Sequence, residues 1–211
     1  MGRTIGEIPP LIAQTTLEFA PGSRVHYSNA APYVLARIVE QRSGQLFHEF
    51  VQRAIFEPAG MRDTYFIVPP CEAARVAVVY RDNRDKNNKE ERTEFCRWDP
   101  AWKVTMTMPD GGLFSYPREI AKFLQLFLDG NGRMLAPETV RAMRTREAPG
   151  WGLGWALEDE GLFHHFGSSG TIAWADPQSG VVGVLFFQLQ NQSKIDPIQA
   201  RFREAVRSAL R

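Results

Sequence analysis

The stretch Val181-Val182-Gly183-Val184-Leu185-Phe186-Phe187 decides the class of fold, because it is almost wholly apolar. A strand with one face in water alternates apolar and polar residues, whereas a strand covered on both faces does not. We therefore expect a central strand within residues 181–189, covered by helices. Two other stretches with strand character precede it, residues 152–157 and 171–174.

Helical periodicity dominates the chain before these strands. Residues 33–41 place Val34, Leu35, Ile38 and Val39 on one helical face, and Gly44 follows as a plausible end of that helix. Further helices are expected over residues 47–56, 115–127, 138–144 and 195–210.

Helices followed by an antiparallel sheet and a terminal helix indicate an α+β fold in one domain, residues 1–211. Residues 1–22 form an irregular lead-in, broken by prolines and glycines. Residues 23–148 form a mainly helical lobe, in which residues 81–92 are expected to be a solvated loop because their opposite charges alternate. Residues 149–211 hold the strands and the C-terminal helix.

Composition excludes several classes of function. The formal net charge of +1 gives no argument for binding nucleic acid, and no apolar run is long enough to span a membrane. Cys71 and Cys96 have no His or Cys neighbours at the spacing of metal ligands, so we do not expect a metal site. The two cysteines are either free thiols or joined in one disulfide. No cofactor or metal is implied. The first residues have no apolar core of a signal peptide, and the compartment stays open.

One short motif has the residues for acyl-transfer chemistry. Tyr27-Ser28-Asn29 lies just before the helix expected at residues 33–41. A phenol beside a cation can move protons at neutral pH, because the cation lowers the pKa of the phenol. The alternative interpretation is structural, with Asn29 as the N-cap of the helix.

Four segments support the chemical interpretation by their order and spacing. They are residues 19–29 (FAPGSRVHYSN), 55–64 (IFEPAGMRDT), 111–115 (GGLFS) and 151–155 (WGLGW). Together they resemble the serine β-lactamase, penicillin-binding protein and family VIII esterase group, from about residue 19 to the end of the chain. The resemblance implies a β-lactamase/transpeptidase-like fold, with an antiparallel sheet flanked by helices plus a helical lobe.

The resemblance also implies site residues. Tyr27 and Asn29 match the second motif of the group, and His165 with Gly167 matches the third motif. The backbone N–H of Ser168 would match one oxyanion donor. The His-x-Gly form favours an esterase of small esters or amides, since β-lactamases usually place a lysine there. His164 is a competing candidate, one residue out of register, and a metal site at both histidines is disfavoured because neighbours on a strand face opposite ways.

The first motif of the group, Ser-x-x-Lys, is absent. No Ser or Thr in this sequence is followed three residues later by Lys. We therefore expect an N-terminally truncated, C-terminal portion without the nucleophile and its base. Ser115 and Ser28 are possible replacements, but we interpret Ser115 as a helix cap, and no lysine follows Ser28 at helical spacing.

A missing central helix would expose large apolar side chains. Repacking, a homodimer or a complementing fragment that covers the missing helix could hide this surface. The sequence therefore predicts a serine hydrolase domain that is inactive alone. The alternative is a pseudoenzyme, a non-catalytic module that binds a ligand or a partner.

Overall fold

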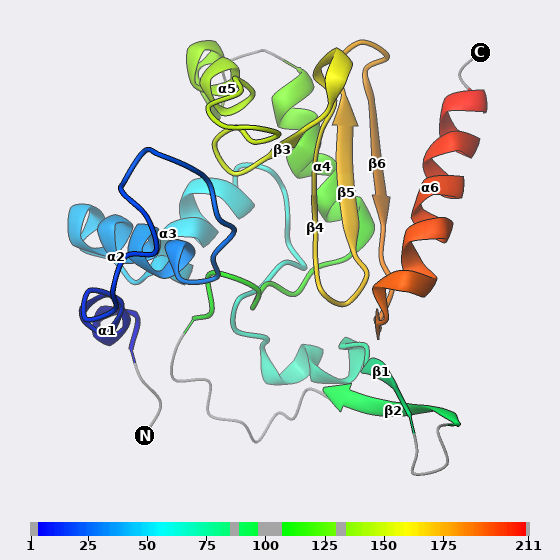
Figure 1. The fold of residues 1–211 in the computed structure, drawn as a ribbon, viewed down its shortest axis with the longest axis horizontal. Helices are drawn as coiled ribbons and strands as arrows, with labels where there is room; N and C mark the ends of the chain where they lie inside the picture. Colours follow the sequence, from blue (N-terminus) through cyan, green and yellow to red (C-terminus); the bar gives the residue numbers. More distant parts are fainter. Residues whose placement is uncertain (1–3, 85–88, 97–106, 130–133, 210–211) are drawn as a thin grey trace.

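The computed structural model describes residues 4–84, 89–96, 107–129 and 134–209 (Figure 1). A sheet stands between helices, and a helical lobe lies beside it. The helices are α1 (Ile8–Ile12), α2 (Ala31–Ser43), α3 (Phe47–Val51), α4 (Pro117–Leu128), α5 (Pro137–Met143) and α6 (Gln192–Ala209), and a π-helical turn, Gln52–Phe56, extends α3. The strands are β1 (Val79–Arg84), β2 (Glu90–Cys96), β3 (Ala156–Leu157), β4 (Phe163–Phe166), β5 (Ile172–Asp176), β6 (Val181–Leu185) and β7 (Leu189–Gln190).

The main sheet has the strand order β3-β4-β5-β6, and every neighbouring pair is antiparallel. The α+β arrangement with an antiparallel sheet is therefore confirmed. Helix α4 packs on one face, where Leu124 and Phe127 join Phe163 and Ala175 in a buried cluster. On the other face Val206 of α6 packs against a second cluster.

The prediction of a central strand at residues 181–189 was wrong in its position. Strand β6 ends at Leu185, and it is the outermost strand of the described sheet. It is apolar throughout because helices cover both of its faces: Val182 and Val184 face α4, while Val181 and Leu185 pack with Val206 of α6. The burial of both faces of β6 therefore did not mean that β6 has a neighbouring strand along each of its edges.

Helix α2 agrees with the predicted helix and ends at Gly44, whose φ of 70° is the left-handed value that favours glycine. Its packing is thin. Ala36 is its one fully buried residue, whereas Leu35 and Ile38, on the predicted apolar face, are 62% and 49% exposed.

The predicted loop at residues 81–92 was wrong for residues 81–84 and 90–92, while residues 85–88 lie outside the described residues. Strands β1 and β2 form an antiparallel hairpin there, and β1 also pairs in parallel with β7. The alternating charges are paired: Arg92 donates to Asp82 at 2.8 Å, and Lys194 of α6 donates to the same carboxylate at 2.9 Å. These cations hold the pKa of Asp82 well below its usual range.

Smaller corrections concern three other segments. The lead-in at residues 1–22 contains helix α1, and β4 was not among the predicted strands. Helix α4 begins after Tyr116, without a side-chain cap, so Ser115 is not its N-cap. Cys71 is a free, exposed thiol, and the side chain of Cys96 lies outside the described residues. Among the described helices, none has the length and apolar character to cross a membrane.

Candidate active site

Tyr27 and His165 both contact one indole ring, that of Trp151. The centroid of the Tyr27 ring is 6.1 Å from that of the Trp151 ring, and the centroid of the His165 ring is 5.9 Å from that of the Trp151 ring. Tyr27 belongs to the irregular segment before α2, and His165 to β4. The fold therefore brings the two sequence motifs to one place, through a residue that belongs to neither.

Strand pairing holds His165 in position. It lies opposite Ala173 in the β4–β5 ladder, and its Nδ1 is 3.0 Å from the carbonyl oxygen of Phe166, to which Nδ1–H can donate. The chain then turns at Gly167, whose N–H donates to the carbonyl of Thr171 at 2.9 Å. A Cβ at Gly167 would overlap the Thr171 hydroxyl, so a larger residue there would force the Thr171 side chain to shift.

His164 has a different environment. It lies opposite Trp174 in the β4–β5 ladder, and its Nε2 is 3.3 Å from a carboxylate oxygen of Glu158. Burial lowers the pKa of His164, which favours a neutral ring, and the Glu158 carboxylate opposes this shift. Glu158 also accepts from Arg203 of α6 at 2.7 Å. His164 thus ties the sheet to α6, and His165 is the histidine beside Tyr27.

The other predicted site residues, Asn29 and Ser168, are close in sequence to Tyr27 and His165 but, among the described residues, form no hydrogen bond with the three rings. In the described part of the chain, no hydrogen bond links Asn29 or Ser168 to Tyr27, Trp151 or His165. Asn29 does not cap α2 either, since Ser28 Oγ instead accepts from the Ala30 N–H at 3.1 Å. Ser168 is exposed in the turn after Gly167.

Ser115 is part of a polar cluster under α4. Its Oγ is 2.8 Å from the Thr64 hydroxyl, which donates to the buried carboxylate of Glu119 at 3.0 Å. Burial opposes ionisation of Glu119, but bonds from the Asp63 N–H, Lys122 and Thr64 outweigh it and lower its pKa. This arrangement attaches the segment around Thr64 to α4, and it contains no histidine to activate Ser115.

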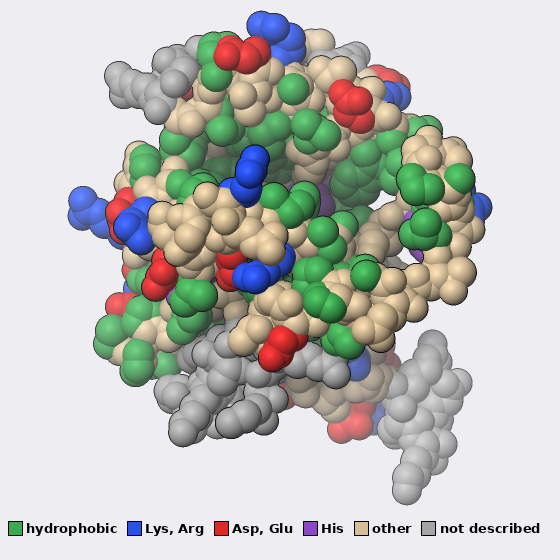
Figure 2. Space-filling view, turned by 90° about the vertical axis from the view of Figure 1, so that its left-hand side faces the viewer, with side chains coloured by type: hydrophobic (Ala, Val, Ile, Leu, Met, Phe, Trp, Pro, Cys, Tyr) green, Lys and Arg blue, Asp and Glu red, His purple; other side chains and the backbone are tan. Residues whose placement is uncertain are grey.

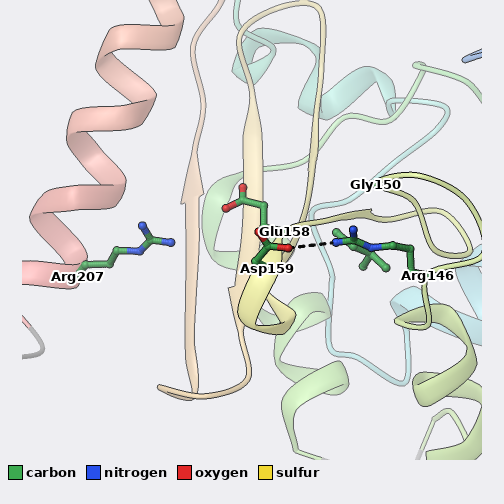
Figure 3. Close-up of a pocket in the computed structure, with 6 residues that line it drawn as sticks. Arg146, Gly150, Glu158, Asp159 and Arg207 are labelled. Atoms are coloured by element: carbon green, nitrogen blue, oxygen red, sulfur yellow. Dashed lines mark ion pairs between the residues drawn. The ribbon is translucent and has the colours of Figure 1, made fainter.

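Tyr27 is 58% exposed, and Trp151 and His165 are partly buried. Figure 2 shows the side of the molecule with the helical lobe, hollowed near its centre, with hydrophobic side chains around the hollow and histidine visible inside it. A cavity of about 510 Å³ lies elsewhere, where Glu158 and Asp159 stand between Arg146 and Arg207 (Figure 3). Among its lining residues Arg146 pairs with Asp159 at 3.6 Å, and Tyr27, Trp151 and His165 do not line the cavity.

Sequence reasoning missed Trp151 as a site residue. The segment WGLGW at residues 151–155 was used only as a mark of the family and as the start of a strand. The available signal was the composition of this segment, in which a large aromatic residue stands beside glycines. In the structure Trp151 is half-buried and is not part of the hydrophobic core. No group of three or more potential metal ligands occurs within the described residues.

Comparison with known proteins identifies the family of the chain. Residues 6–207 match the family described as Beta-lactamase. A protein of Escherichia coli (strain K12) named "Putative D-alanyl-D-alanine carboxypeptidase" is 26% identical over 223 residues, which cover 91% of this chain and 51% of that protein. The chain thus spans about half the length of this curated relative.

Solved structures show the same fold. EstCE1, a hydrolase with promiscuous acyltransferase activity, superposes with a TM-score of 0.77 at 20% identity, over 91% of this chain and 58% of its own. The octameric penicillin-binding protein homologue from Pyrococcus abyssi gives a TM-score of 0.61 at 27% identity, over 79% of this chain and 39% of its own. The chain belongs to the Beta-lactamase family, that of the β-lactamase-related serine hydrolases.

Proposed function

We propose that this chain supplies the Tyr27/His165 half of an acyl-hydrolase site that acts on small esters or amides. A complementing polypeptide segment supplies the nucleophilic serine and its lysine. The observation that carries the proposal is the shared contact of Tyr27 and His165 with Trp151, because residues of two distant motifs meet there.

The proposed reaction needs a proton shuttle, an oxyanion donor and a wall that orients the substrate. The serine oxygen attacks the carbonyl carbon while Tyr27 passes the proton of the serine to the leaving group. The Ser168 N–H donates to the oxyanion, and water then releases the acyl group. Asn29 and the His165–Gly167 segment hold the substrate. Since His165 stands where β-lactamases commonly carry lysine, the site favours ester hydrolysis.

A serine-directed fluorophosphonate probe tests this proposal by intact mass, together with turnover of p-nitrophenyl butyrate. The chain alone should give neither an adduct nor turnover. With a segment of a family member that carries Ser-x-x-Lys, a stoichiometric adduct and turnover should appear, and Tyr27→Phe in this chain should abolish the turnover. The matched control is the same segment with its motif serine changed to alanine. A stoichiometric adduct on the chain alone would contradict the proposal, because it would mean that a serine of this chain is the nucleophile.

A second candidate function is non-catalytic binding of a partner. The exposed Leu35 and Ile38 on α2 favour it, because an exposed apolar helix face is a common contact surface. Size-exclusion chromatography separates the two cases. A stable dimer that no Ser-x-x-Lys segment can convert into an active enzyme would favour the binding module.

A further inference from the structure

Four aromatic rings form a continuous row at the candidate site. Their order is Tyr27, Trp151, His165 and Phe166, and the centroid separations between neighbours are 6.1, 5.9 and 5.8 Å. Trp151 meets His165 at an interplanar angle of 64°, and His165 stacks on Phe166 at 28°. These are the separations at which aromatic rings attract one another beyond simple burial.

The row reaches the surface at both ends. Tyr27 is 58% exposed and Phe166 is 48% exposed, while Trp151 and His165 are partly buried between them. Large aromatic side chains are usually buried, so two exposed rings that continue a buried pair offer an unused contact surface.

The row carries no ion pair in the part of the chain that the structure describes. A neighbouring ion pair, Arg146 with Asp159 at 3.6 Å, does not involve the four rings. The rings of Trp151 and Phe166 have no ionisable group, so a carboxylate placed on them would lose water without gaining a charged partner from them.

We propose that this row, hereafter the aromatic row, is a subsite that binds an uncharged aromatic acyl group, with Trp151 as its specificity-determining residue. The proposal deepens the proposed function, on which it rests, by naming a substrate class: aryl-substituted esters or amides in preference to short aliphatic ones or charged peptides. Trp151 is the residue that matters most, because among the ring contacts of the described residues its ring is the one that meets both Tyr27 and His165.

Binding without chemistry tests the aromatic row. The chain alone is titrated with phenylacetamide, with butyramide and with N-acetyl-D-alanyl-D-alanine, while the indole N–H signals are followed by NMR. The Trp151 signal is assigned by its loss in Trp151→Phe. Phenylacetamide should bind roughly three- to tenfold more tightly than either other ligand, the range that one aromatic contact gives.

Variants locate the effect. Trp151→Leu should remove most of that preference, and Trp151→Phe, which keeps a ring, should retain part of it. Phe95→Leu is the matched control, since Phe95 is an aromatic residue of similar exposure (46%) that packs on Arg81 outside the row. Equal binding of phenylacetamide and butyramide, or an unchanged preference in a folded Trp151→Leu variant, would overturn the proposal.

The two proposals fail separately. Turnover of p-nitrophenyl butyrate in the complemented protein, without aromatic preference in these titrations, would remove the aromatic row and keep the hydrolase. Aromatic preference that persists while complementation gives no turnover would leave a binding site for aryl groups and remove the hydrolase.

Discussion

Leu124 of α4 and Leu35 of α2 are the same residue type on helices of similar length, yet Leu124 is fully buried and Leu35 is 62% exposed. Helix α4 lies between the sheet and the cluster of Val51, Phe56 and Met61, so both of its sides have neighbours. Helix α2 has few. The difference teaches that periodicity predicts which residues share a face, whereas the presence of a packing partner for that face is decided elsewhere in the chain.

The largest expected effect breaks the buried side of this comparison. Leu124→Ala should lower the free energy of unfolding by about 2–5 kcal/mol, because it removes buried methyl groups and leaves a cavity. Leu35→Ala is the control and should change it by less than about 0.5 kcal/mol. Urea unfolding followed by circular dichroism measures both. Similar losses in the two variants would mean that the α2 face is buried in solution.

A medium effect is expected at the edge of the sheet. Gly183 on β6 lies under the indole of Trp174, and an added Cβ would overlap that ring. Gly183→Ala should therefore cost about 1–3 kcal/mol through overpacking. Gly111→Ala is the matched control, since a Cβ there meets no atom and the backbone needs no left-handed conformation. Thermal unfolding of both variants checks the contrast, which an unaltered Gly183→Ala protein would contradict.

A smaller, pH-dependent effect is expected where α6 meets the sheet. The Arg203 guanidinium holds the pKa of Glu158 below its usual range. A carboxyl group whose pKa is lower in the folded state stabilises the fold at neutral pH, and this stabilisation is lost as the pH falls through the folded-state pKa.

Arg203→Met should therefore destabilise the protein at about pH 7, by less than about 1 kcal/mol because Glu158 is partly exposed. The variant and the wild type should converge in acid, below the ordinary glutamate pKa of about 4.3. Urea midpoints across that range give the comparison. A difference in stability between the wild type and Arg203→Met that grows as the pH falls would show that the ion pair does not cause the difference.

The smallest change in stability, and the sharpest test of the exposed side, comes from α2. Replacing both Leu35 and Ile38 with Gln should change the free energy of unfolding by less than about 0.5 kcal/mol per site, since neither is buried. It should nevertheless reduce binding of the dye ANS and self-association, which depend on exposed apolar surface. Unchanged dye binding would place the apolar surface elsewhere.

The sequence predicted the helices well because their apolar spacing and end signals are local. Gly44 ends α2 as predicted, and Pro137 begins α5. Prediction from the sequence failed where a segment is held by residues that are far away along the chain. The charges at residues 81–92 suggested a loop, because nothing nearby shows that Lys194 pairs with Asp82 and that Leu189 lies beside Tyr80.

The candidate site divides in the same way. Tyr27 and His165 could be proposed from short motifs, and the structure places both against Trp151. Trp151 was missed, because its contacts with Tyr27 and His165 join segments that are far apart in the sequence. Ser115 was misread as a helix cap for a related reason: its partner, Thr64, is a distant residue held by the buried Glu119.

The parallel pairing of β1 with β7 has a consequence for the order of folding. Strands β3 to β6 pair with their neighbours in sequence, so this meander closes only short loops and can form rapidly. The pairing of Tyr80 with Leu189 instead closes a loop that contains α4, α5 and the whole meander. We therefore expect the β1–β2 hairpin to dock late, when Lys194 and Asn191 reach Asp82, and to be the first part of the sheet system to detach on unfolding.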